Sequence, residues 1–304
     1  MKHQQPKFII CIQGPTASGK SDLALYLAKQ FDSEIISADS RQFYKEMTIG
    51  TAKPPPADQQ LAKHHFVDFL SVNDKYSAYD FEQQALEVIG SLLDQEKIPV
   101  VVGGSGLYID AIIHGFNSIP DVDFELRTQL IDEFNQSGLE SMLKKLELLD
   151  PDYFEIVDRS NPRRVLRALE VCIGSGIRYS KFLNEPKATR LFKTIKIGIS
   201  YPADSLYSLI NQRCDIMLQN GLIDEVQSLL QYKQLSALQT IGYREFFRYF
   251  DHECSIDFAI EKFKQHTRNF AKKQMSWLRR DPDINWFIPP DKKLVLDYIS
   301  KCLY

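Results

Sequence analysis

The chain has 304 residues and a formal net charge of −3, from 37 Lys and Arg against 40 Asp and Glu. Hydrophobic residues make up 44% and charged residues 25%, which is ordinary for a globular protein and excludes a disordered, collagen-like or coiled-coil chain. The slightly acidic balance also argues against a general nucleic-acid binder, because such domains are usually basic.

The sequence shows neither a membrane segment nor a secretory leader. No apolar run approaches the roughly 20 residues of a transmembrane helix, and the start of the chain is polar. The five cysteines are widely spaced without a CxxC pair, so neither a disulfide framework nor a zinc site is indicated. Adjacent histidines, His64 and His65, point in different directions and have no third ligand at useful spacing, which favours a structural role. We therefore expect a cytoplasmic protein with no membrane partner.

Short β-branched runs alternate with helical patterns along the chain. The strand candidates are residues 7–13, 34–37, 98–102 and 194–200. A helical pattern spans residues 81–93, and the chain is mainly helical after residue 201. This alternation predicts an α/β fold with a parallel sheet that is flanked by helices.

Charge is distributed unevenly in the middle of the chain. Residues 121–158 carry eleven acidic and three basic side chains at helical spacing, and residues 159–169 then carry four arginines and no acid. We expect residues 118–190 to form a small helical insertion domain between two strands of a core that consists of residues 1–117 and 191–304.

A phosphate-binding loop follows the first strand. Residues 14–21, GPTASGKS, fit the pattern GxxxxGK[ST] with a strand before it and a helix after it. Glycines let backbone N–H groups converge on phosphate oxygens, the helix N-terminus adds a favourable dipole, and Lys20 adds a positive charge. The hydroxyl of Ser21 is placed to ligate Mg²⁺. The loop predicts a P-loop NTPase-like core that binds a diphosphate or triphosphate, with a kinase as the default class.

Asp39 follows the second strand, at the same carboxyl edge of the sheet as the P-loop. A carboxylate at this place can hold Mg²⁺ through water, act as a general base, or cap the turn before Ser40. The third strand ends at this edge in the glycine-rich turn 103–106, which by itself indicates only a tight turn.

Seven sequence blocks follow one another in the order found in one enzyme family. They are GPTASGKS (14–21), ADSRQFYKEMTIGTAKP (38–54), HHFVDF (64–69), VVGGSGLYIDAI (101–112), NPRRVLRALEV (161–171), IGYREF (241–246) and TRNFAKKQMSWLRR (267–280). Together these blocks cover essentially the whole chain and resemble the tRNA dimethylallyltransferase family. The bacterial type is implied, because no C-terminal zinc finger follows as in some eukaryotic relatives.

The resemblance implies a reaction and its participants. The family transfers the dimethylallyl group of dimethylallyl diphosphate to N6 of adenosine 37, in tRNAs that read codons starting with U. The P-loop would then hold a prenyl diphosphate, with Mg²⁺ at Ser21, and pyrophosphate would leave. The tRNA anticodon stem-loop is the implied partner, and we expect a monomer. We also expect adenosine and the diphosphate to enter from opposite ends of a channel.

Roles for single residues follow from the same resemblance. The implied catalytic residues are Asp39, as the base, with Lys20, Thr16 and Arg213. The implied diphosphate-binding residues are Gly14, Pro15, Thr16, Ala17, Ser18, Gly19, Lys20 and Ser21. The implied tRNA-binding residues are Asp39, Ser40, Arg41, Gln42, Ser105, Arg127, Arg163, Arg164, Arg167, Tyr243, Arg244, Arg268, Lys272 and Lys273. Arg41, Ser105 and Arg163 depart from the residues more usual in the family.

Two local basic patches are hidden by the net charge of the whole chain. Between Lys262 and Arg280 there are seven Lys and Arg and no acid, and the arginines of residues 159–169 form the other patch. Both predict contacts with tRNA phosphates. Phe263, Phe270 and Trp277 recur every seven residues in the first patch, a helical stripe that favours core packing over base stacking.

Other interpretations account for only part of the sequence. A small-molecule kinase explains the P-loop and Asp39 but neither basic patch. An adenylate isopentenyltransferase would keep the P-loop and the aspartate without needing a tRNA surface. A non-catalytic RNA-binding module would leave the P-loop unexplained.

Overall fold

The computed structural model describes residues 6–116, 119–120, 122–183 and 189–303. The chain divides into two compact units, one of residues 1–113 with 190–304 and one of residues 114–189. The second unit lies within a few residues of the predicted insertion at both ends.

A six-stranded parallel sheet forms the centre of the first unit, in the order β3-β2-β4-β1-β5-β6. Its strands are β1 (Phe8–Gln13), β2 (Ile35–Ser37), β3 (His64–His65), β4 (Val100–Gly103), β5 (Lys193–Ile199) and β6 (Asn285–Phe287). The predicted α/β fold with a parallel sheet is confirmed. The two edge strands β3 and β6 were not predicted, because their sequences, His-His and Asn-Trp-Phe, lack the β-branched residues that revealed the equally short β2.

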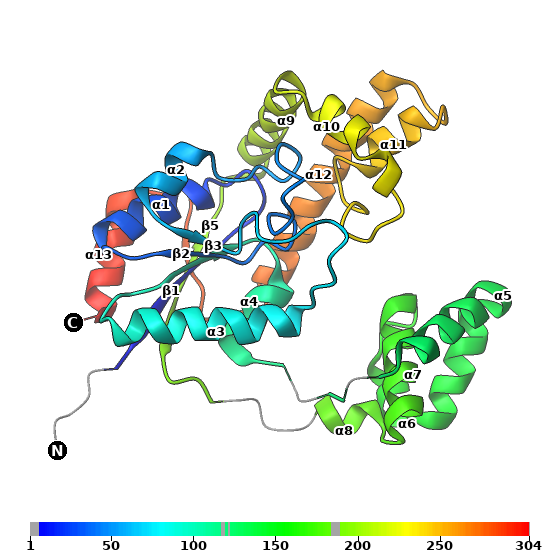
Figure 1. The fold of residues 1–304 in the computed structure, drawn as a ribbon. Coiled ribbons are helices and arrows are strands. Elements are labelled where there is room, and N and C mark those ends of the chain that lie inside the picture. The colour runs from blue at the N-terminus through cyan, green and yellow to red at the C-terminus, as the bar shows by residue number, and fades with distance from the viewer. Residues whose placement is uncertain (1–5, 117–118, 121, 184–188, 304) are drawn as a thin grey trace, which may run out of the picture. The chain divides into compact units, whose positions relative to one another are not determined.

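Alternating residues of the central strand β1 enter two separate cores. Ile10 and Ile12 pack in a core with α1 (Lys20–Gln30) and α13 (Lys292–Leu303). Ile9 and Cys11 pack in the other core, which includes α3 (Ala78–Asp94). This is the period of two expected for a strand that is covered on both faces, and it fixes the sheet between two layers of helices (Figure 1).

The remaining helices of this unit lie mostly in its C-terminal part. They are α2 (Pro56–Leu61), α4 (Gly106–His114), α9 (Ala203–Gln219), α10 (Leu222–Ser228), the short 3₁₀ helix η1 (Leu230–Tyr232), α11 (Arg244–Phe250) and α12 (Ile256–Leu278). Helix α12 packs against both α9 and α11. No helix in the described part of the chain combines the length and the apolar character needed to cross a bilayer.

The second unit consists of helices in its described residues. They are α5 (Phe124–Leu149), α6 (Pro151–Ile156), α7 (Pro162–Ser175) and α8 (Tyr179–Leu183). Asp150 is fully buried, and its carboxylate accepts hydrogen bonds from the backbone N–H of Tyr153 at 3.1 Å and from the N–H of Ser180 at 2.7 Å. One acidic side chain therefore caps α6 and ties α8 to it, although most of the unit's acids are exposed.

Candidate active site

The P-loop lies between β1 and α1, and its shape depends on two glycines. A Cβ atom on Gly14 would lie 2.3 Å from the backbone oxygen of Ile199, so only glycine lets the loop start this close to β5. Gly19 has a φ of +83° and forms the N-cap of α1, which has no side-chain cap. The first N–H groups of α1 therefore point into the loop, where an anion can accept their hydrogen bonds.

Lys20 and Arg213 bring two positive charges to the loop. The Lys20 Nζ atom donates to the carbonyl of Pro15 at 2.6 Å, and Arg213 of α9 donates to Thr16 Oγ1 at 3.0 Å. Burial, together with Arg213, lowers the pKa of Lys20 to about 7, while Asp39 opposes the shift. Burial also lowers the pKa of Arg213, and Asp39 again acts in the opposite sense. Because a bound anion would relieve the repulsion between these cations, the site favours a phosphate ligand.

These residues line a cavity of about 440 Å³, which we call the P-loop cavity. Its charged lining residues are Lys20, Asp22, Asp39, Asp58 and Arg213. The structure thus brings together the predicted catalytic residues Thr16, Lys20, Asp39 and Arg213, although Arg213 lies far from the other three in the sequence.

A second cavity of about 430 Å³ adjoins the first, and we call it the apolar cavity. Its apolar walls come from α9, α12 and the segment before α11: Ile210, Met217, Ile241, Phe263, Phe270 and Trp277. Ser40, Arg41, Ser105 and Lys273, all predicted to contact tRNA, also line it. The two cavities have five lining residues in common: Thr16, Asp39, Gly104, Arg213 and Gln274.

Asp39 is at this junction because it follows β2 directly after Ala38. One carboxylate oxygen, Oδ1, accepts the backbone N–H of Arg41 at 3.0 Å. The side chain is half-buried and borders both cavities. It can therefore reach a group that enters from either side, as a general base between two substrates must.

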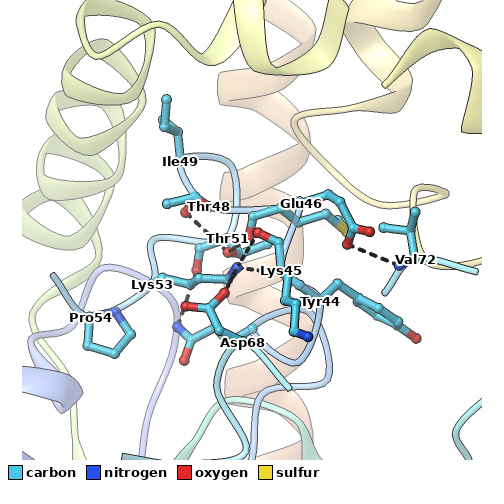
Figure 2. A network of polar contacts seen from close by, with 12 residues as sticks. Tyr44, Lys45, Glu46, Thr48, Ile49, Thr51, Lys53, Pro54, Asp68 and Val72 are labelled. Carbon is cyan, nitrogen blue, oxygen red and sulfur yellow. Dashed lines mark hydrogen bonds and ion pairs between the residues drawn. The ribbon is translucent and has the colours of Figure 1, made fainter. Parts of the chain in front are cut away.

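A network of buried polar contacts folds the loop that follows Asp39 (Figure 2). The side chain of Lys53 is only 2% exposed. Its ammonium donates to the carbonyls of Tyr44 at 2.5 Å and Lys45 at 3.2 Å and pairs with Asp68. The hydroxyl of Thr51 donates to the carbonyl of Met47 at 2.7 Å. The loop that ends at Lys53-Pro54-Pro55, just before α2, is thus held by the hydrogen bonds and the ion pair of the buried Lys53 side chain.

Arg41 and Gln42, both predicted to bind tRNA, also hold this loop. The Arg41 guanidinium donates to the carbonyls of Ser236 at 3.2 Å and Ala237 at 2.9 Å. The Gln42 amide donates to the carbonyl of Ala52 at 3.2 Å and its oxygen accepts the Ser37 hydroxyl at 3.0 Å. Both side chains therefore have structural contacts in addition to any contact with a ligand.

Tyr243 differs from the prediction that it contacts tRNA. Its side chain is fully buried, and its hydroxyl donates to Glu225 Oε1 at 2.6 Å. The same carboxylate accepts the backbone N–H groups of Thr48, Ile49 and Gly50 at 3.0, 2.7 and 3.0 Å. Burial raises the pKa of Tyr243, and Glu225 raises it further. Tyr243 is therefore a core residue that helps to anchor the loop, whereas its neighbour Arg244 is exposed.

The aromatic stripe of α12 also differs from the prediction of core packing. Phe263 is buried at 3% exposure, as predicted, but Phe270 is 43% exposed and borders the apolar cavity together with Trp277. On the same helix Lys272 and Lys273 are exposed, and Arg268 donates to Asn211 Oδ1 at 2.7 Å. The helix therefore presents one cation, Lys273, and the rings of Phe263, Phe270 and Trp277 to the cavity.

Gln274 of α12 was missed by the sequence analysis. Its side-chain oxygen accepts the backbone N–H of Thr16 at 2.8 Å, and its amide nitrogen donates to the carbonyl of Gly104 at 2.8 Å. Gln274 lies within the block TRNFAKKQMSWLRR. The only local feature that could have pointed to it is a polar amide among cationic and apolar residues.

The predicted tRNA-binding arginines of the insertion all lie in the second unit. Arg163 and Arg164 are exposed on α7. Arg127 and Arg167 both pair with Glu170, at 3.4 and 3.1 Å, and Glu170 is 4% exposed. The exposed pair is therefore the part of this patch that is freest to meet a phosphate backbone.

His64 and His65 form strand β3, with contacts to the protein. His64 Nδ1 lies 2.8 Å from the carbonyl oxygen of Ala62, and His65 Nε2 lies 2.5 Å from Glu34 Oε2. In the described part of the chain, no group of three or more His, Cys, Asp or Glu side chains is placed to hold a metal ion.

The parallel sheet, the P-loop at its carboxyl edge and the two adjoining cavities define a P-loop α/β protein. A sequence model described as IPP transferase matches residues 42–281, and the chain belongs to this family. It is therefore a member of a family of transferases, and the resemblance found in the sequence is confirmed.

Full-length relatives and solved structures support the assignment. A tRNA dimethylallyltransferase of Christiangramia forsetii is 46% identical and matches 96% of this chain and 97% of its own length. A tRNA isopentenylpyrophosphate transferase of Bacillus halodurans has a TM-score of 0.73 at 32% identity, with 98% of this chain and 97% of that chain covered. A eukaryotic dimethylallyltransferase, described in crystallographic snapshots as acting on tRNA, has a TM-score of 0.81 at 28% identity. The match covers 97% of this chain and 80% of that chain.

Proposed function

We propose that this protein transfers the dimethylallyl group of dimethylallyl diphosphate to N6 of adenosine 37, in tRNAs that read codons starting with U. The observation that carries the proposal is the pair of adjoining cavities with Asp39 at their junction. One cavity is charged and fits a diphosphate, and the other has aromatic walls and fits a base. Membership in the IPP transferase family supports the same reaction.

The diphosphate binds in the P-loop cavity in this proposal. The loop's N–H groups, Lys20 and Arg213 hold its oxygens and stabilise the charge that develops when the allylic C–O bond breaks. Thr16 Oγ1, which accepts from Arg213, belongs to the same anion site. Pyrophosphate is then the leaving group.

The adenine binds in the apolar cavity and meets the allylic carbon at the junction. A base that is extruded from an anticodon loop costs less to unstack than one in a duplex, and aromatic faces such as Phe270 and Trp277 can receive it. The N6 lone pair forms the new C–N bond as the C–O bond breaks, and Asp39 takes the N6 proton. The alternative role of Asp39 is to hold Mg²⁺ through a water molecule. For this role Asp39 would need to face only the P-loop cavity.

Oxygen donors around the P-loop fit Mg²⁺ as the cofactor. Ser21, Asp22, Asp39 and Asp58 line the P-loop cavity, and no all-protein cage is seen among the described residues. This suits Mg²⁺, which usually keeps several waters and binds through few protein oxygens plus phosphates. We propose Ser21 as its protein ligand. When bound, the ion would neutralise charge on the diphosphate.

The tRNA anticodon stem-loop is the proposed partner. Exposed cations on α12 and α7, including Lys272, Lys273, Arg163 and Arg164, supply phosphate contacts. We propose that the protein acts as a monomer in the cytoplasm. A kinase or an adenylate isopentenyltransferase is not favoured, because the full-length relatives are named for tRNA.

Incubation with labelled dimethylallyl diphosphate, Mg²⁺ and unmodified tRNA tests the proposal. Label is expected in tRNA and not in AMP, and ATP should not be consumed. Label in AMP alone would indicate an adenylate isopentenyltransferase, and ATP consumption without prenyl transfer would indicate a kinase. A tRNA with adenosine 37 replaced by guanosine is the matched control and should stay unlabelled.

A further inference from the structure

Gln274 joins two segments that line the site, the P-loop and the turn that follows β4. It is 8% exposed and projects from α12. Its oxygen accepts from Thr16 of the P-loop and its nitrogen donates to Gly104 of the turn that follows β4, both at 2.8 Å. A carbonyl needs a donor and an N–H needs an acceptor, so only one orientation of the carboxamide satisfies both partners.

The turn of residues 103–106 is shaped to receive α12. A Cβ atom on Gly104 would lie 2.3 Å from Gln274 Nε2, and one on Gly106 would lie 2.3 Å from Trp277 Cε2. Positions 274 and 277 are neighbours on one face of the helix. The glycine-rich turn therefore meets α12 at two points, and this contact sets the position of Ser105 in the apolar cavity.

Thr16 makes two hydrogen bonds within the protein. Its backbone N–H is bonded to Gln274 and its hydroxyl oxygen to Arg213. The N–H of Thr16 is thus engaged by the protein, unlike the N–H groups at the start of α1, where no side chain caps the helix. Thr16 contributes to the anion site through its hydroxyl and Arg213, and Gln274 fixes the backbone that carries it.

We infer that Gln274 is a positioning residue that sets the P-loop wall against the wall of the apolar cavity, so that the allylic carbon and the adenine nitrogen meet at reacting distance. The inference rests on the proposed function. Gln274 borders both cavities and joins the segment that holds the leaving group to the turn that bounds the acceptor. Loss of its two hydrogen bonds should therefore disturb alignment more than the binding of either substrate.

The variant Gln274→Met tests this, because methionine keeps the length and shape of the side chain but cannot make the two hydrogen bonds. We expect the single-turnover rate of prenyl transfer to fall by about 10- to 100-fold, the effect of a misplacement near 1 Å. The Kd of tRNA and that of a non-hydrolysable dimethylallyl diphosphate analogue should change less than about threefold, since the cationic and aromatic contacts remain.

Gln265→Met is the matched control. Gln265 is on the same helix, and its side chain accepts from Lys262 at 2.8 Å, outside both cavities. Its rate should equal that of the wild type. An unchanged rate in Gln274→Met, or a decrease explained wholly by weaker binding or by a smaller folded fraction, would overturn the inference. Absence of tRNA labelling by the wild type would instead reject the proposed function.

Discussion

The two cavities of the site differ in how their walls are made. The P-loop cavity is formed by the P-loop backbone and by charged side chains of α1, α2 and α9 together with Asp39 after β2, whereas the apolar cavity is formed mainly by side chains of α9 and α12. Charge and fixed backbone dipoles suit a diphosphate, whose oxygens carry negative charge. Aromatic and aliphatic walls suit a base, whose faces are apolar and whose edges are polar.

Substitutions at each cavity should therefore separate recognition of the two substrates, and substitutions at the junction should affect neither. Asp39→Asn is the junction variant with the largest expected effect. We expect the rate of transfer to fall by about 10²- to 10⁴-fold, because the general base is removed while the shape of the side chain is kept. Kd values for tRNA and for the diphosphate analogue, measured by titration, should stay near the wild-type values. Equal loss of rate and binding would make Asp39 a structural residue.

Arg213 borders both cavities, but its guanidinium is bonded to Thr16 of the P-loop, so Arg213→Gln should weaken the anion site and leave the apolar walls of the second cavity in place. Removal of one donor to the developing charge is expected to lower kcat by about 10²- to 10³-fold. Steady-state kinetics with varied dimethylallyl diphosphate should show the decrease, and filter binding should show unchanged tRNA affinity. A tRNA affinity that falls with kcat would contradict the division of labour between the two cavities.

Phe270→Ala should weaken the apolar cavity and leave the P-loop cavity intact. Stacking of a base on an aromatic ring contributes about 1–3 kcal/mol, so we expect the KM for tRNA to rise by about 5- to 160-fold. Affinity for the diphosphate analogue should not change. Phe258→Ala is the control, because Phe258 is also exposed on α12, at 41%, but lies outside both cavities. Equal effects of the two substitutions would remove the apolar cavity as the base site.

The pH dependence of diphosphate binding sharpens the comparison further. The pKa of Lys20 is lowered to about 7 in the free protein, so its ammonium loses its proton as the pH rises above 7. A bound anion raises this pKa, and binding then takes up a proton. Affinity for the diphosphate analogue should therefore fall by up to about tenfold per pH unit above pH 7, and Lys20→Met should flatten this slope. Calorimetry in buffers of different ionisation enthalpy should detect the proton uptake.

The smallest expected effect concerns the exposed cations. Lys272→Ala with Lys273→Ala should reduce the slope of log K against log[salt] for tRNA binding by about one for each phosphate that the variant no longer neutralises. The double variant Arg163→Ala with Arg164→Ala should reduce the same salt slope through the arginines of the second unit. An unchanged slope in either pair would mean that those lysines or arginines do not bind phosphate.

Site residues that belong to a local sequence pattern could be predicted from the sequence. The P-loop and Asp39 stand next to strands whose β-branched runs can be seen directly, and Arg213 followed from the family resemblance. Gln274, Glu225 and the buried position of Tyr243 could not be predicted, because each depends on packing between segments that are far apart in the chain. A seven-residue spacing likewise placed Phe263, Phe270 and Trp277 on one face, but it could not show where that face leaves the core and borders a cavity.

The position of β1 in the sheet has a consequence for biosynthesis. Phe8 pairs with Lys193, so more than half of the chain must be made before the central strand receives its second neighbour. Until then one edge of a largely apolar strand has no partner, and pairings so distant in sequence form slowly. The helical insertion is synthesised within this interval and has a core of its own. We therefore expect the nascent chain to need protection from aggregation from the completion of β4 until β5 leaves the ribosome.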